Sequence, residues 1–220
     1  MDHPPLAPTR PQDRRGRDFI ARHGETVFNA AGRLQGDHPH TPLTRAGFAQ
    51  ADEIGRAMRN LLGARPALTL WASPTGRALQ TLAIIAEHLG LDWHGARTDP
   101  RLVEIDMGSW GGRYYAELAA EVGPVVVPGG LLTPAPDGET YGEIAARTAA
   151  WLADTDHLDG DRLVIMHGIS SRVLRGVMTR AAPHPAFAAP IASSLPQGSL
   201  VMIEHGSEQL VHRGTGHAPA

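Results

Sequence analysis

The sequence predicts an α/β fold with a mostly parallel central sheet, and three observations carry that prediction. Short apolar runs typical of buried strands alternate with segments whose apolar residues recur at helical spacing. Three of the runs end in side chains suited to an anion, in turns at residues 22–23, 73–77 and 167–168. Parallel strands align their carboxyl ends at one edge of the sheet, where ligands bind. We therefore expect the three turns to lie close together.

The elements of the first half follow from these patterns. Residues 17–21 predict a strand, and residues 68–72 predict a second one that is buried. Thr44 is a suitable N-cap for the helix between them, and residues 73–74 turn the chain into another helix. The predicted buried face of the first helix consists of Phe48, Ala51, Ile54, Met58 and Leu61, and that of the second of Leu79, Leu82, Ile85, Ala86 and Leu89.

The segment 113–138 is expected to be a lid insertion. An extended piece ends near Leu102, and residues 113–122 have a helical pattern. Residues 123–138 are rich in proline and glycine and form an unusually long connection of low regularity. Connections of that length are often functional loops such as active-site lids.

The second half returns to regular elements. A helix is expected from Tyr141, with Ile144, Ala145, Thr148, Trp151 and Leu152 facing inward. Residues 163–166 are the clearest buried strand, and a helix follows residue 168. The runs 199–204 and 209–213 predict a closing hairpin.

Composition limits the classes of function. The 220 residues suffice for one domain, expected at 18–213 between tails at 1–17 and 214–220. A content of 42% hydrophobic and 20% charged residues is typical of a soluble globular protein, and the net charge of -3 argues against nucleic-acid binding. All 20 basic residues are arginine, which excludes Schiff-base chemistry. The absence of cysteine excludes disulfides and thiol nucleophiles. No apolar stretch predicts a signal peptide or a membrane span, so we expect a cytoplasmic protein.

The turn at residues 22–26 reads Arg-His-Gly-Glu-Thr and carries the most chemical information. Imidazole is a nucleophile that is largely neutral near pH 7, and guanidinium binds phosphate through paired hydrogen bonds. Glycine lets the backbone approach a ligand closely. Taken alone, the pentapeptide also fits a surface turn with an incidental histidine, and the rest of the chain has to decide.

Further segments follow this turn in a fixed order, and together they resemble the histidine phosphatase superfamily, the phosphoglycerate mutase-like proteins. The segments are residues 34–36, 42–47, 73–81, 102–110 and 166–168. The resemblance implies a three-layer α/β/α sandwich of the phosphoglycerate mutase-like kind. The chain departs from the family pattern at His40, at Gly111 and at Ile169, which leaves the pocket wall and the choice of substrate open.

The resemblance also implies roles for individual residues. His23 is the expected nucleophile, which takes the phosphoryl group and becomes phosphohistidine. Arg22 and Arg77 are expected to hold the phosphoryl oxygens, with His167 completing the pocket. Glu104 is the candidate general acid, which first protonates the leaving oxygen and then activates water. Asp106 is the other carboxylate that could be the general acid, but we expect it to be a solvated charge in a loop.

Substrate contacts are expected from Asn29 and Gln35, with no metal and no cofactor. Asn29 matches a phosphate-contacting position of the family, and its sequence context alone suggests a helix-cap or turn residue. The remaining histidines show no metal-ligand spacing. Each catalytic candidate taken singly has an ordinary structural explanation, and only their joint occurrence points to a site.

Three functions remain open at this point. Residues 103–108 are similar to the phosphatase branch, so the first hypothesis is a metal-independent phosphatase acting on a small phosphorylated metabolite, without nucleic-acid or membrane partners. The second is a cofactor-dependent phosphoglycerate mutase, and the third a non-catalytic phosphate-binding module. Tyr114, Tyr115 and residues 125–127 either make the pocket apolar or pack the lid onto the core. The oligomeric state and the substrate itself stay open.

Overall fold

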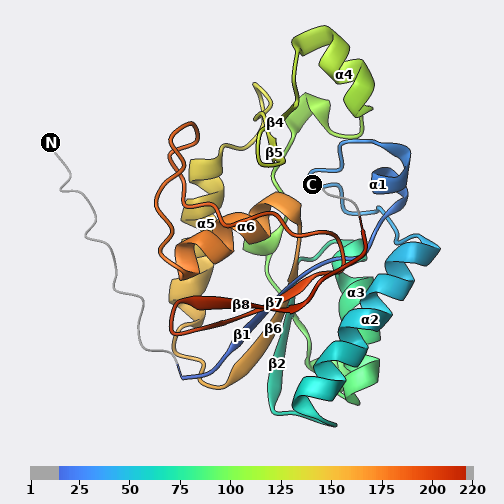
Figure 1. Ribbon diagram of the computed structural model, residues 1–220, viewed down its shortest axis with the longest axis vertical. Helices are drawn as coiled ribbons and strands as arrows, with labels where there is room; N and C mark the ends of the chain where they lie inside the picture. Colours follow the sequence, from blue (N-terminus) through green and yellow to red (C-terminus); the bar gives the residue numbers. More distant parts are fainter. Residues whose placement is uncertain (1–14, 217–220) are drawn as a thin grey trace, which may run out of the picture.

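The computed structural model describes residues 15–216 and is built around a six-stranded sheet (Figure 1). The strands are β1 (Asp18–Arg22), β2 (Leu68–Ala72), β3 (Arg97–Thr98), β6 (Asp161–Met166), β7 (Leu200–Glu204) and β8 (Ser207–His212). Their order is β3-β2-β6-β1-β7-β8. The first four in that order are parallel, whereas β7 runs antiparallel to β1 and forms the predicted hairpin with β8.

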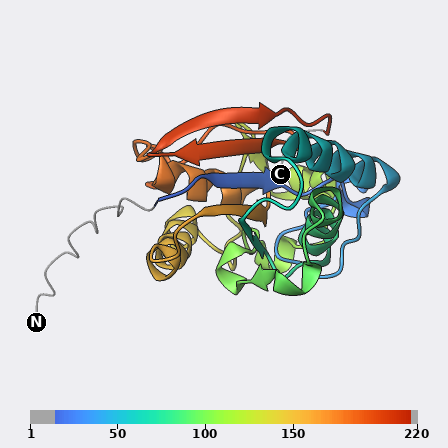
Figure 2. The ribbon, with the colours of Figure 1, turned by 90° about the horizontal axis from the view of Figure 1, so that it is seen from below.

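Helices cover both faces of this sheet (Figure 2). The helices are α1 (Val27–Ala31), α2 (Arg45–Leu62), α3 (Gly76–Leu89), α4 (Tyr115–Val122), α5 (Tyr141–Thr155) and α6 (Gly168–Met178). On one face, Phe19 and Leu163 join a core with Ile54 of α2. On the other, Ile20 and Val164 pack with residues of α5 and α6. Successive strand residues point to opposite faces, so the predicted three-layer α/β/α sandwich is confirmed.

The three anion-suited turns do meet at one edge, as expected. Arg22 pairs with Met166 across β1 and β6, and Ala72 pairs with Ile165 across β2 and β6. Main-chain hydrogen bonds continue the pairing of the strands one residue further. The His23 amide donates to the Met166 carbonyl and the Ser73 amide donates to the Ile165 carbonyl, both at 3.0 Å. The first residues of each turn are therefore held side by side by the sheet itself.

The buried face of α2 differs from the prediction. Ala51, Ile54 and Met58 are buried, but Phe48 and Leu61 are 45% and 48% exposed. The helix approaches α3 most closely at Gly55, where a Cβ would lie 2.3 Å from the His88 ring. Apolar periodicity alone could not show this, because the closest packing occurs where the helix has no side chain.

The predicted lid, residues 113–138, is more regular than expected. It contains α4 and a short hairpin of β4 (Val126–Val127) and β5 (Leu131–Leu132). Gly129 and Gly130 turn the hairpin with φ of 82° and 67°, a region that favours glycine. Figure 1 shows the segment above the carboxyl ends of the parallel strands. This position places it over the three turns.

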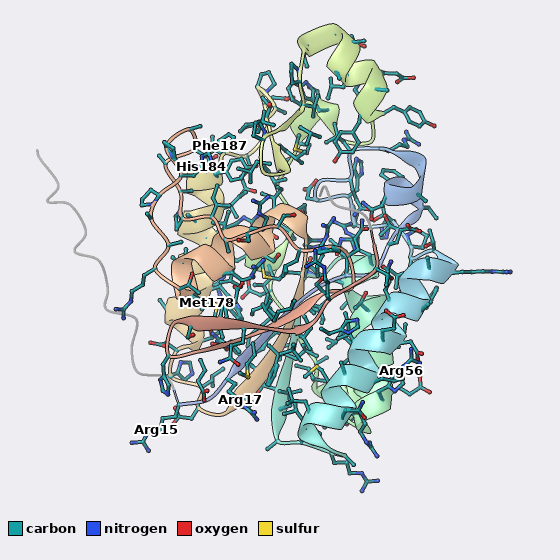
Figure 3. The ribbon with its side chains drawn as sticks, viewed as in Figure 1. Arg15, Arg17, Arg56, Met178, His184 and Phe187 are labelled. Atoms are coloured by element: carbon teal, nitrogen blue, oxygen red, sulfur yellow. The ribbon has the colours of Figure 1, made fainter. Side chains whose placement is uncertain are left out.

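The end of the predicted N-terminal tail contacts the domain. Arg17 donates to both carboxylate oxygens of Asp161, at 2.5–3.1 Å, and Gly160 donates to the Arg15 carbonyl at 2.7 Å. Figure 3 shows both arginines near the start of β1. The rest of that tail, residues 1–14, and residues 217–220 of the C-terminal one lie outside the described residues. Within residues 15–216, no helix is both long and apolar enough to span a bilayer.

Candidate active site

His23 is a buried imidazole whose hydrogen bonding leaves one nitrogen free to attack. It follows β1, and its Nδ1 lies 2.7 Å from the Gly24 carbonyl. A carbonyl only accepts, so Nδ1 carries the proton and Nε2 keeps its lone pair. Burial, with a smaller effect of Arg77 and Arg22, holds the pKa of His23 well below 6.5. The ring is therefore neutral at pH 7, with a lone pair on Nε2 that is available to an electrophile.

Gly24 is required next to His23 because the backbone there has no room for a side chain. A Cβ at Gly24 would lie 2.2 Å from the Gly47 carbonyl, and one at Gly47 would lie 2.0 Å from the Glu25 carbonyl. The turn therefore packs directly on the first turn of α2, whose N-cap Thr44 bonds the Gly47 amide as predicted.

His167 carries a buried N–H group on a ring that lies beside His23. It caps α6 at the end of β6, and its ring lies 5.1 Å from the His23 ring. Arg77 Nε donates to its Nδ1 at 3.1 Å, so the proton is on Nε2. Nε2 is buried and has no hydrogen-bond partner in the described part of the chain. An unpaired buried N–H is costly, and a ligand oxygen would satisfy this one.

Arg77 fastens several segments together at the start of α3. Besides the bond to His167, its Nη1 donates to the His38 carbonyl at 2.6 Å and the Thr41 hydroxyl at 2.8 Å. Its Nη2 donates to the Gly36 carbonyl at 2.8 Å. The guanidinium thus holds the loop after α1 against His167. A direct contact with phosphate stays a prediction.

Arg22 supplies a second buried cation. It is 3% exposed, and its Nη1 donates to the Leu195 carbonyl at 3.0 Å. Burial lowers the pKa of both Arg22 and Arg77 to about 10, which the charge of Glu104 partly offsets. Both guanidinium groups remain charged at pH 7. Two buried cations thus lie near one carboxylate, an excess of positive charge that suits an anionic ligand.

Glu104 is held by the main chain of three residues. Its Oε1 accepts from the amides of Ile105 and Ser170 at 2.9 and 2.8 Å, and its Oε2 accepts from Ile169 at 2.9 Å. Two of these amides form the first turn of α6, whose helix dipole favours negative charge. Asp106 is exposed and caps the Gly108 amide at 2.7 Å. Of the two rival carboxylates, Glu104 lies nearer the site.

A small cavity opens at this cluster. Its lining includes His23, Glu104 and Gly168 from the strand-end turns, and Gln35, Tyr115 and Leu132 from the loop and the lid. Tyr115 lines it, whereas Tyr114 is 43% exposed beside Arg33. Leu132 is the lining residue that sequence reasoning missed, because no motif marks it.

The two predicted substrate contacts fall in different places. Gln35 lines the cavity, with its Oε1 2.5 Å from the Thr26 hydroxyl. Asn29 belongs to the capping box of α1, where its Oδ1 accepts from the Thr26 amide at 3.1 Å. Their contacts with a substrate stay predictions. No group of three or more His, Asp and Glu residues suited to a metal ion occurs among residues 15–216.

The fold and the positive charge of this cluster are those expected of a protein that binds a phosphoryl group, and sequence comparison gives the family. A family model described as "Histidine phosphatase superfamily (branch 1)" matches residues 19–214, so the chain belongs to that family. This confirms the predicted family and the phosphoglycerate mutase-like fold.

Named relatives include both mutases and phosphatases. Two proteins named "Probable phosphoglycerate mutase GpmB", from Enterobacter sp. and Yersinia pestis, are 38% and 34% identical over 69% of each chain. A mycobacterial glucosyl-3-phosphoglycerate phosphatase, solved with VO3, has a TM-score of 0.72 and 22% identity over 89% of this chain and 97% of its own. The Thermus thermophilus protein TTHB049 has a TM-score of 0.62 and 27% identity over 90% and 99%.

The buried histidines should make stability depend on pH. Burial lowers the pKa of His167, as it does that of His23, so the unfolded chain takes up protons first as the pH falls below 6.5. The free energy of unfolding should therefore decrease on acidification from pH 6.5, by roughly 1 kcal/mol per pH unit for each histidine. Urea unfolding between pH 5 and 7 measures the slope.

Substitutions show whether the buried histidines cause the dependence of stability on pH. His167→Gln should make the slope shallower, whereas His94→Gln, at an exposed site, should leave it unchanged. Equal slopes for His167→Gln and the unaltered protein would contradict the neutral, buried state of His167.

Proposed function

We propose that this protein is a metal-independent phosphatase that hydrolyses small phosphomonoesters through a phosphohistidine on His23. The observation that carries the proposal is the unpaired, buried Nε2–H of His167 beside the nucleophilic ring of His23. The excess positive charge of Arg22 and Arg77 supports it. These are the donors that phosphoryl transfer requires, because its catalysis is mainly positioning and charge stabilisation.

In the first half-reaction, Nε2 of His23 attacks phosphorus and the bond to the leaving oxygen breaks. The Nε2–H of His167 and the guanidinium of Arg22 receive the phosphoryl oxygens, while Arg77 keeps His167 in the donating tautomer. Glu104 takes up a proton from solvent and gives it to the leaving oxygen. The product alcohol then departs, and His23 holds the phosphoryl group on nitrogen.

In the second half-reaction, water attacks phosphorus and the phosphorus–nitrogen bond breaks. Glu104 accepts the proton of the water, which suits a carboxylate already held as an acceptor by three amides. The phosphate leaves, and the neutral ring of His23 is restored. Every step uses groups of the chain itself.

The mutase remains the second candidate, because relatives 34–38% identical carry that name. Incubation with 3-phosphoglycerate, with and without bisphosphoglycerate, separates the two functions. The proposal predicts that phosphate release on a phosphomonoester panel exceeds isomerisation. Isomerisation far above phosphate release would assign the mutase instead.

Two further measurements test the route. Mass spectrometry after an acid-free quench should find a phosphoryl group on His23, and its absence with every member of the panel would favour a non-catalytic binding module. EDTA should leave turnover unchanged, and loss of activity on chelation would refute the metal-free route.

Glu104→Gln should slow turnover in a way that depends on the leaving group. An amide cannot give up a proton to the departing oxygen, so we expect kcat/KM, which reports the first half-reaction and not the shared hydrolysis of phosphohistidine, to fall by about 10²–10³-fold for alkyl phosphates. The loss should be smaller for p-nitrophenyl phosphate, because its leaving group needs no protonation. Steady-state kinetics on both substrates provides the comparison. An equal loss on the two would show that Glu104 does not act as the acid.

A further inference from the structure

The cavity beside His23 has a distinctive charge pattern on the side away from the phosphate-handling residues. The wall there includes Tyr115 and Leu132 of the lid and Gln35 of the preceding loop. Burial raises the pKa of Tyr115, so its phenol is neutral at pH 7. Glu104 is the only acidic residue in the lining, and no arginine is present among the described lining residues. The charge of Arg22 acts on Tyr115, but the proposed function assigns this cation to the phosphoryl oxygens. A leaving group placed here therefore meets neutral groups and one carboxylate.

Two other arginines that contact the lid or its neighbours, Arg172 and Arg33, are held by their own partners. Arg172 of α6 donates through Nε and Nη1 to the carbonyls of Ala192 and Gly130, at 3.0 and 3.1 Å. Arg33 donates to the Gly112 carbonyl at 2.6 Å and lies against the Tyr114 ring. None of these groups belongs to the cavity lining.

Two further arginines, Arg113 and Arg147, are paired with carboxylates of the protein. Arg113 pairs with Glu121, and Arg147 donates to both oxygens of Glu139 at 2.6 and 2.9 Å. A carboxylate or a second phosphate on the leaving group would therefore enter without a cationic partner. Burial of an unpaired charge is strongly unfavourable.

Leu132 is fixed in the cavity wall by the hydroxyl of Tyr141. This hydroxyl accepts from the Leu132 amide at 2.9 Å and donates to the Leu132 carbonyl at 3.0 Å. Tyr141 is 1% exposed and stacks on Phe187, with ring centroids 4.3 Å apart, and Phe187 in turn stacks on His184. Figure 3 shows Phe187 and His184 together near the start of α5. The stack positions the hydroxyl, and the hydroxyl positions Leu132.

From this geometry we infer that the substrate is a phosphate ester of an uncharged alcohol, that Leu132 and Tyr115 select it, and that Tyr141 is the positioning residue behind Leu132. This inference rests on the proposed phosphatase function and goes beyond it by naming the class of leaving group. It excludes phosphoglycerates as preferred substrates. A neutral leaving group with an apolar part gains from Leu132 and Tyr115, and an anionic one loses its hydration without compensation.

Three substrates of the same reaction test the inference. Glycerol 3-phosphate and 3-phosphoglycerate differ chiefly in a hydroxymethyl group against a carboxylate, and 2-phenylethyl phosphate adds apolar surface. We expect kcat/KM for glycerol 3-phosphate to exceed that for 3-phosphoglycerate at least about tenfold, with 2-phenylethyl phosphate higher still. A preference for 3-phosphoglycerate in phosphate release would overturn the inference and leave the phosphatase standing. Release from none of the three, or isomerisation in its place, would overturn the phosphatase and the inference with it.

Variants assign the preference to particular residues. Leu132→Arg should bring the two kcat/KM values at least about tenfold closer, by pairing the carboxylate. Val122→Arg adds the same charge at a 52% exposed site of α4 and should leave the ratio unchanged. Equal effects of the two variants would show that the charge of the lid as a whole, and not the cavity wall, sets the preference.

Tyr141→Phe tests the positioning without adding a charge. Loss of the hydroxyl frees Leu132, so KM for 2-phenylethyl phosphate should rise several-fold while the inhibition constant of inorganic phosphate stays constant. A merely structural role would alter both constants together, and an unchanged KM would refute the positioning of Leu132 by Tyr141. This variant remains informative if Leu132→Arg fails to fold.

Discussion

His23→Ala should abolish the phosphoenzyme and lower kcat/KM by about 10⁴-fold or more. The physical reason is that Nε2 of His23 is the group free to form a bond to phosphorus, because Nδ1 is committed to the Gly24 carbonyl. Burial also lowers the pKa of His23 well below 6.5, so the imidazole is neutral at pH 7 and keeps its lone pair on Nε2. Steady-state kinetics and intact-mass analysis after an acid-free quench measure the two effects.

A matched histidine in the following loop provides the control. His40 is exposed, and we expect His40→Ala to retain activity within about twofold. A phosphoryl group found on His23→Ala protein would mean that another residue is the nucleophile. Circular dichroism of both variants shows whether the fold is retained.

Arg77→Met should cost both activity and stability. The variant leaves the carbonyls of Gly36 and His38 and the hydroxyl of Thr41 without their donor, and we expect the free energy of unfolding to drop by about 2–4 kcal/mol. It also removes the donor that fixes the proton of His167 on Nε2. In serine proteases, loss of the residue that fixes the histidine tautomer costs about 10⁴-fold in kcat. For Arg77→Met we expect kcat to fall by roughly 10³-fold. Urea unfolding and kinetics report the two losses separately.

Arg77→Lys distinguishes charge from geometry. A lysine keeps the positive charge but cannot reach His167 and the loop carbonyls at once. Stability should therefore recover in part, whereas kcat should stay at least about 10²-fold below that of the unaltered protein. Recovery of full activity in Arg77→Lys would show that Arg77 acts by its charge and not by holding His167.

The strand-end turns could be predicted because they depend on local sequence and on one general property of parallel sheets. Short apolar runs mark β1, β2 and β6, and adjacency of these strands brings Arg22, His23 and His167 together. The bond from Arg77 to His167 spans 90 positions and the bonds to residues 36–41 span 36–41 positions. Such long-range hydrogen bonds leave no local pattern in the sequence. The sequence therefore predicted a phosphate contact for Arg77 but not its bonds to His167 and to the loop at residues 36–41.

Neighbouring residues show the same limit. Tyr114 and Tyr115 are chemically equal in the sequence, yet one is exposed and the other lines the cavity. The amide of Tyr115 donates to the Gly32 carbonyl, a contact between the start of α4 and a distant loop. Periodicity does not indicate which distant loop a helix start will meet, and it therefore could not separate the two tyrosines.

The grip on Glu104 has a consequence for mutagenesis. Ile169 and Ser170 hold this carboxylate with main-chain amides, which every residue except proline retains. An alanine scan of α6 would consequently leave both bonds intact, although they orient a carboxylate some 65 positions away in the chain. Among the coded amino acids, proline alone would expose the contact, and the first turn of a helix is where proline is tolerated.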